Sequence, residues 1–125
     1  MLSAPLTATH VVDLAALTIR PHRDGGTHVL VLSGELDIAS ADAVQAMLER
    51  VEATAALQNI VVDLRELRFI DSTGLRLLIE AARRADTAAY RLRIVRPAAA
   101  VFRVFEIAGV DTLLPFADAP TEADA

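Results

Sequence analysis

Four residues near the middle of the chain, Asp71-Ser72-Thr73-Gly74, carry the groups best suited to chemistry. A carboxylate and two hydroxyls stand directly before a segment with helical periodicity, where such side chains accept hydrogen bonds from free N–H groups of a first helical turn. A phosphoryl group on Ser72 would meet those N–H groups and the positive end of the helix dipole, and would add about −1.5 to −2 charges beside Asp71. The position therefore suits a phosphorylation switch.

Nucleophilic catalysis by Ser72 is the first alternative. A hydrolase elbow has the pattern Gly-x-Ser-x-Gly, whereas this chain has Ile70 at the first position. The only histidines are His10, near the N-terminus, and His22 and His28, which flank a predicted hairpin. None is expected beside Ser72, so a serine hydrolase is disfavoured.

Metal binding is the second alternative. His22 and His28 straddle a predicted turn with Asp24 between them, a pattern more typical of solvated hairpin side chains. Three carboxylates could also converge at the ends of strands, where ligands bind in open α/β sheets: Asp37, Asp63 and Asp71. No spacing among them requires a hard cation. We therefore expect no metal and no cofactor.

Composition excludes several classes of function. The 125 residues are 54% hydrophobic with a net charge of −5, which predicts one folded domain and disfavours direct nucleic-acid binding. The chain has no Cys and no Lys, so disulfides, thiol nucleophiles, Schiff bases and P-loops are absent. No apolar run is long enough for a membrane span, and no signal peptide is recognisable, so we expect a cytoplasmic protein that does not bind membranes.

Charge is distributed unevenly along the chain. Residues 65–103 hold nine arginines and only four acids, and the remainder is correspondingly acidic. Such arginines are usually solvated, but they could also form a docking face for an acidic partner.

The periodicity predicts strands and helices in alternation. A hairpin is expected over residues 14–32 with its turn at Asp24-Gly25-Gly26, followed by a helix from about Ser40. The β-branched run 60–64 predicts a strand buried on both faces, then a short loop leading to the Ser72 helix. A strand is expected at 92–95 and a short last strand at 113–116. Between them lies a helix that begins near Pro97 and is stopped by Gly109.

The expected organisation is one domain over residues 13–116. Residues 1–12 are expected to form a flexible leader, and residues 117–125 an acidic tail. The unit from residue 60 to residue 95 should be a parallel strand–helix–strand crossover, so a mixed sheet with helices packed on it is the expected architecture.

Four stretches in order resemble one known family. They are Ser33-Gly34-Glu35-Leu36-Asp37, Val61-Val62-Asp63-Leu64, Phe69-Ile70-Asp71-Ser72-Thr73-Gly74-Leu75 and residues 101–110. Together they resemble the STAS family (sulfate transporter and anti-sigma factor antagonist) over residues 14–116. The resemblance implies an α/β fold in which a single mixed β-sheet of four to five strands is packed with three to five helices.

A free-standing domain with Asp-Ser-Thr-Gly resembles the bacterial anti-sigma factor antagonists. These are not enzymes: each binds an anti-sigma factor that is also a serine kinase and so releases a sigma factor. The resemblance implies that the kinase phosphorylates Ser72, with Thr73 as a minor acceptor, that a metal-dependent serine phosphatase reverses this, and that the free protein is a monomer. It implies a phosphosite surround and docking surface of Asp37, Asp71, Thr73, Gly74 and Arg76.

One position departs from the family pattern. Members often have Gly-Leu-Gly after the acceptor pair, whereas this chain has Gly74-Leu75-Arg76. Arg76 could select a partner or neutralise part of an added phosphate. Two other functions remain open: a STAS scaffold or transport accessory subunit without a phosphorylation cycle, and a nucleotide-binding STAS module.

Overall fold

The computed structural model describes residues 12–14 and 16–118, so most of the predicted leader (1–11, including His10) and of the acidic tail (119–125) lies outside the described residues. The described residues form six strands and three helices. They are β1 (Val12–Leu14), β2 (Leu17–Asp24), β3 (Thr27–Leu36), α1 (Ala41–Glu52), β4 (Asn59–Ile70), α2 (Ser72–Thr87), β5 (Arg91–Val95), α3 (Ala99–Ile107) and β6 (Phe116–Ala117).

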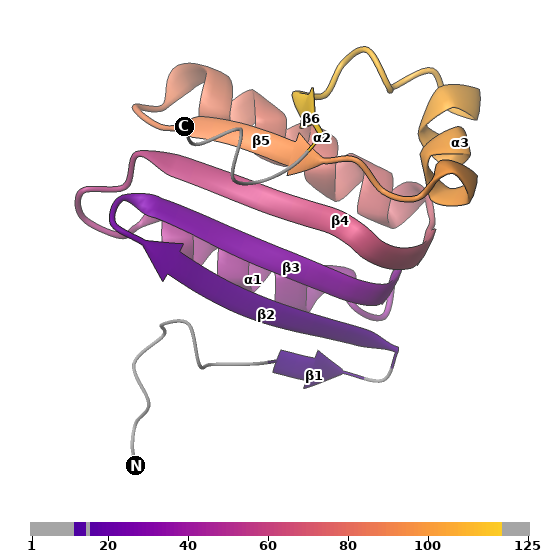
Figure 1. Cartoon of the computed structure of the whole chain (residues 1–125), viewed down its shortest axis with the longest axis horizontal. Helices are drawn as coiled ribbons and strands as arrows, with labels where there is room; N and C mark the ends of the chain where they lie inside the picture. Colours follow the sequence, from indigo (N-terminus) through magenta and orange to yellow (C-terminus); the bar gives the residue numbers. More distant parts are fainter. Residues whose placement is uncertain (1–11, 15, 119–125) are drawn as a thin grey trace.

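The strands form one mixed sheet in the order β1-β2-β3-β4-β5-β6 (Figure 1). β1, β2 and β3 pair antiparallel, whereas β3–β4, β4–β5 and β5–β6 pair parallel. The mixed α/β fold, the hairpin and the parallel unit are therefore confirmed. Four strands form the body of the sheet, and the short β1 and β6 extend it to six within the described residues. The last strand begins at Phe116, later than predicted.

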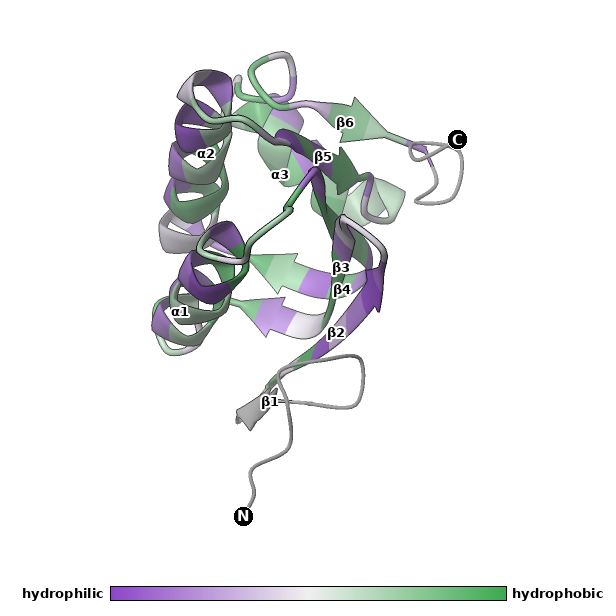
Figure 2. Ribbon diagram, turned by 90° about the vertical axis from the view of Figure 1, so that its left-hand side faces the viewer, coloured by the Kyte–Doolittle hydropathy of each residue, from purple (hydrophilic) through white to green (hydrophobic). Residues whose placement is uncertain are grey.

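The helices are arranged asymmetrically on the sheet. Figure 2 shows α1 and α2 side by side on one face, and Figure 1 shows α3 at the end of the molecule where β4 and β5 end. The main core fills the space between the sheet and the helices, and alternate strand residues on the other face form a small cluster of Val29, Val61 and Val95. No described helix is long and apolar enough to cross a membrane.

The strand after α1 is longer than predicted. β4 continues to Ile70, through the segment where the sequence indicates a loop. Its register against β3 shifts twice, and at each shift β4 holds one residue more than β3, as in a β-bulge. The partners before and after the shifts are Val31↔Asp63 and Ser33↔Glu66, then Gly34↔Leu67 and Glu35↔Phe69. The bulges interrupt the alternation of buried and exposed residues, which is why the sequence resembles a loop there.

A close approach of backbone explains the glycine in β3. Gly34 has a φ of +108°, and a Cβ at this position would lie 1.9 Å from the carbonyl oxygen of Ala16. The next residue, Glu35, donates its N–H to that same oxygen at 2.9 Å. Only glycine fits here, because both the conformation and the space exclude a side chain.

One carboxylate joins three elements on the helical side. Glu52, at the end of α1, accepts hydrogen bonds from Arg84 of α2 at 3.0 Å and from the Tyr90 hydroxyl before β5 at 2.7 Å. Burial, together with this bond to Glu52, raises the pKa of Tyr90. Arg84 is half-buried in this contact and pairs with Glu52 rather than with Glu80, which lies four residues before it on the same helix.

Candidate functional site

The site is built around the first turn of α2. Asp71 is the N-cap residue, with extended backbone, and its Oδ1 accepts the N–H of Gly74 at 3.0 Å. The N–H of Leu75 bonds to the Asp71 carbonyl oxygen at 3.0 Å. The predicted helix start is therefore confirmed, with one carboxylate as the cap. Among the described residues, no hydrogen bond engages the hydroxyl of Ser72 or Thr73.

The same Asp71 holds the loop that follows β3. Its Oδ2 accepts the N–H of Ile38 at 3.2 Å, and its own N–H donates to the Leu36 carbonyl oxygen at 3.2 Å. Within the loop, Asp37 Oδ1 accepts the N–H groups of Ala39 and Ser40 at 3.0 and 3.2 Å. Asp37 therefore shapes the loop, and the link between Asp71 and Ile38 brings that loop to the start of α2.

The two hydroxyls of the motif differ in exposure and surroundings. Ser72 is exposed and borders an open groove that includes Ile79 and Val110. Thr73 is half-buried and borders a second groove on the side of α1. Arg76 is exposed, lies one turn after Ser72 on the same helix face and borders both grooves. A charge on Ser72 would therefore form within reach of a guanidinium.

Gly74 is buried and serves the fit of α2 against the strands. A Cβ there would lie 2.8 Å from Ile70 Cγ1 and 2.9 Å from both Cγ and the carbonyl oxygen of Leu36. Because the backbone of α2 packs directly on these residues, Gly74 positions Ser72 rather than offering a contact surface of its own.

Apolar side chains near the site were not found from the sequence. Ile38, in the loop held by Asp71, is 77% exposed. Phe69, in β4 two residues before Asp71, is 48% exposed. Ile107 is 74% exposed near the end of α3, at the same end of the molecule (Figure 1). A gathering of exposed large apolar residues is typical of interaction surfaces, so this end of the molecule is a candidate for one. The sequence could have indicated Ile38 and Phe69, because neither belongs to a helical or strand pattern of buried apolar residues.

The arginine-rich segment is partly neutralised in space. Three of its nine arginines form ion pairs with acids that lie outside residues 65–103 in the sequence, so the local positive charge of the sequence overstates that of the surface. The pairs are Arg65–Asp63, Arg84–Glu52 and Arg96–Asp118. Arg76 forms no ion pair within the described residues, so its charge stays available beside Ser72.

The carboxylates considered for a cation do not form a site. Asp63 is buried and bonds to Arg65 at 2.8 Å, while Asp37 and Asp71 accept backbone N–H groups. Across the part of the chain that the structure describes, no three His, Asp or Glu residues are grouped to hold a metal ion.

Comparison with known proteins gives consistent matches. A family model described as "Mlab, STAS domain" matches residues 19–115. The anti-sigma F factor antagonist of Paenibacillus polymyxa is 24% identical over 102 residues, or 82% of this chain and 87% of that protein. The solved structure of the anti-sigma factor antagonist SpoIIAA in its unphosphorylated form is 25% identical, with a TM-score of 0.70 over 85% of this chain and 91% of that chain. The Bacillus cell fate determinant SpoIIAA in its phosphorylated form gives 24% identity and a TM-score of 0.65, covering 85% of this chain and 95% of that chain.

Proposed function

The chain belongs to the STAS domain family, and we propose that it acts as an anti-sigma factor antagonist switched by phosphorylation of Ser72. In this proposal it binds an anti-sigma factor that is also a serine kinase, and the sigma factor is released. A metal-dependent serine phosphatase restores the unmodified form. The protein itself is not an enzyme, works in the cytoplasm and is a monomer when free.

The observation that carries the proposal is the exposed hydroxyl of Ser72, which forms no hydrogen bond with the described part of the chain and lies at a helix N-terminus capped by its neighbour Asp71. Because Asp71 already caps the helix, Ser72 is free to be modified without loss of the cap. The matches to anti-sigma factor antagonists over most of the chain support the same function.

The proposed docking surface combines Ser72 with the exposed apolar side chains Ile38 and Phe69 and with Arg76. Apolar anchors of this kind contribute most of the affinity in many interfaces. A phosphate on Ser72 would bring negative charge beside Asp71, and a partner that approaches closely would have to desolvate it. Binding should therefore weaken on modification, while Arg76 offsets part of the added charge.

Modification of Ser72 is tested directly by incubation with the cognate kinase and ATP, followed by phosphopeptide mass spectrometry. We expect one main phosphate on Ser72 in the wild type, little on Thr73, and none on Ser72 in the Ser72→Ala variant. Thr73→Ala should be modified as fully as the wild type. Absence of label at Ser72 would contradict the switch.

Binding is tested with three substitutions at the same position. Ser72→Asp should bind the kinase at least about tenfold more weakly than wild type, because its carboxylate, beside Asp71, would lose its hydration on association. Ser72→Asn is the matched control, since it has the same size without the charge, and Ser72→Ala should also retain binding. Equal affinity of the Asp and Asn variants would show that charge does not control the interaction. Calorimetry with ATP and GTP, with no heat expected, separates this function from nucleotide binding.

A further inference from the structure

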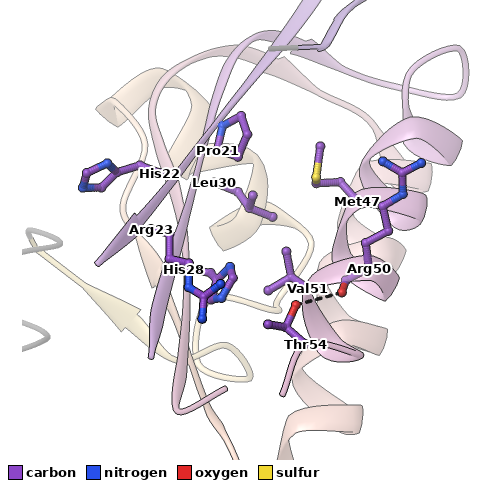
Figure 3. A pocket seen from close by; sticks show the side chains of 9 residues that line it. All are labelled: Pro21, His22, Arg23, His28, Leu30, Met47, Arg50, Val51 and Thr54. Atoms are coloured by element: carbon purple, nitrogen blue, oxygen red, sulfur yellow. Dashed lines mark hydrogen bonds between the residues drawn. The ribbon is translucent and has the colours of Figure 1, made fainter. Parts of the chain in front are cut away.

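A small cavity lies at the end of the molecule opposite Ser72, between the β2–β3 hairpin and the last turns of α1 (Figures 1 and 3). Its volume is about 50 Å³, which is room for a few waters or a short organic ligand. The phosphorylation proposal does not involve this place, so the two can fail independently.

The cavity contains an unsatisfied polar atom. His28 is only 7% exposed, and its Nε2 is buried without a hydrogen-bond partner. In Figure 3 the imidazole points from β3 toward Val51 and Thr54 of the α1 side. No described group bonds to Nε2, and the Thr54 hydroxyl among the lining side chains bonds instead to the Arg50 carbonyl oxygen at 3.1 Å. Buried polar atoms in native proteins almost always have a partner, so this nitrogen indicates a missing one.

The lining of the cavity favours an anion with an apolar body. Arg23 lies beside His28, held by a hydrogen bond from its Nε to the Gly25 carbonyl oxygen at 3.0 Å. No acidic side chain of the described residues lines the cavity, whereas Leu30, Met47 and Val51 provide apolar walls. A cation would meet like charge here, and inorganic phosphate or sulfate would leave the apolar walls without a complementary surface.

We propose that this cavity binds a short-chain aliphatic monocarboxylate. The carboxylate accepts a hydrogen bond from Nε2 of His28 and faces the guanidinium of Arg23, and the hydrocarbon chain packs against Leu30, Met47 and Val51. A carboxylate bonded to a ring N–H and beside a guanidinium is a charge-assisted arrangement, which is stronger than a neutral hydrogen bond.

The test is a titration of the ¹⁵N-labelled full chain with acetate, propionate and butyrate, followed by amide NMR. We expect saturable shifts around His28 and on the last turns of α1, with butyrate bound more tightly than acetate because it buries more apolar area. Butanol lacks the charge and inorganic phosphate lacks the apolar chain, so both should bind at least about tenfold more weakly than butyrate.

Two substitutions assign the site. His28→Leu removes the hydrogen-bond donor. Arg23→Gln removes the charge of an exposed side chain, so this replacement should not disturb folding. Each variant should bind butyrate at least about tenfold more weakly than the wild type. Arg103→Gln makes the same change at an exposed arginine of α3, at the opposite end of the molecule, and should bind as the wild type does. The proposal is overturned if no acid gives saturable shifts, if the shifts lie elsewhere, or if Arg23→Gln binds like Arg103→Gln.

Discussion

Asp71 uses the two oxygens of one carboxylate for two different contacts. Oδ1 caps α2 through Gly74, and Oδ2 accepts the N–H of Ile38 in the loop after β3. The helix that presents Ser72 and the loop that presents Ile38 are therefore held by a single side chain. A partner that touches both would recognise a surface whose geometry Asp71 maintains.

Replacing Asp71 should lower stability even though the residue is only half-buried. Asp71→Ala removes the cap, so the free energy of unfolding should fall by about 1–2 kcal/mol. Asp71→Asn keeps an accepting oxygen at the cap and should lose clearly less. Urea denaturation of both variants measures the difference. Equal stability of Asp71→Ala and the wild type would show that the capping bond contributes nothing.

His28 should make the stability of the protein sensitive to mildly acidic pH. Burial, aided by the charge of Arg23, lowers the pKa of His28 from its ordinary 6.5. Below pH 6.5 the unfolded chain takes up a proton that the folded protein resists, so stability should decrease as the pH falls from 7.5 to 5.5. A single proton limits the slope to about 1.4 kcal/mol per pH unit.

Chemical denaturation at several pH values measures this slope. His28→Gln should flatten it, whereas His22→Gln, at an exposed position of the same hairpin, should leave it unchanged. If the wild type and His28→Gln lose stability in parallel, another group is responsible.

At the scale of elements, the β3–β4 pair determines where Ser72 lies. β4 runs from Asn59 to Ile70, and its two bulges set the register in which it ends beside Leu36 of β3. α2 begins directly after this strand, and the bare backbone of Gly74 lets it pack on both strand ends. A shift of register would move the hydroxyl away from the loop that carries Ile38.

The close approach at Gly34 provides a test of this arrangement. Gly34→Ala should lower the free energy of unfolding by at least about 3 kcal/mol, since its Cβ meets the Ala16 carbonyl and its φ is strained. Gly25 also has a positive φ, of 61°, but a Cβ there would meet no other atom. Gly25→Ala should therefore lower the free energy of unfolding by only about 1–2 kcal/mol. Similar losses in both variants would mean that the contact with Ala16 relaxes readily.

The Glu52 contact should couple α1, α2 and β5. Glu52→Ala leaves Arg84 and Tyr90 without their shared acceptor and should cost about 1–3 kcal/mol. In a double-mutant cycle with Tyr90→Phe, the two losses should be less than additive, because each single change removes the same hydrogen bond. Strict additivity, measured by thermal or urea denaturation, would show that the contact does not contribute to stability.

At the scale of the whole molecule, the sequence predicts features that depend on neighbours along the chain. The turn at Gly25, the helix that begins near Ser40 and the cap of α2 at Asp71 all follow from local pattern, and all are confirmed. The full length of β4 depends on pairing with a distant strand, so it could not be predicted. The exposure of Ile38 could not be predicted for the same reason, since it depends on which elements surround the loop.

The candidate site divides in the same way. Ser72 could be recognised as an exposed hydroxyl because helix starts have a local signature. The cavity at His28 could not, because it requires the hairpin and the end of α1 to meet in space. His28 is buried although the sequence indicates a solvated hairpin histidine.

The edges of the sheet have a consequence for concentrated solutions. Within the described residues, β1 has three residues and β6 has two. A long edge strand presents a row of unpaired N–H and C=O groups on which another chain can assemble, and edges as short as β1 and β6 offer little template. Beyond the three residues that pair with β1, the outer edge of β2 carries Arg20, Pro21, Arg23 and Asp24, and proline and charged side chains on an edge also discourage such pairing. We expect sedimentation velocity to give one unchanged species over a wide concentration range, and growth of larger species would contradict this. Copies of the protein would then stay separate at high concentration, and the end of each molecule that carries Ser72 would remain accessible.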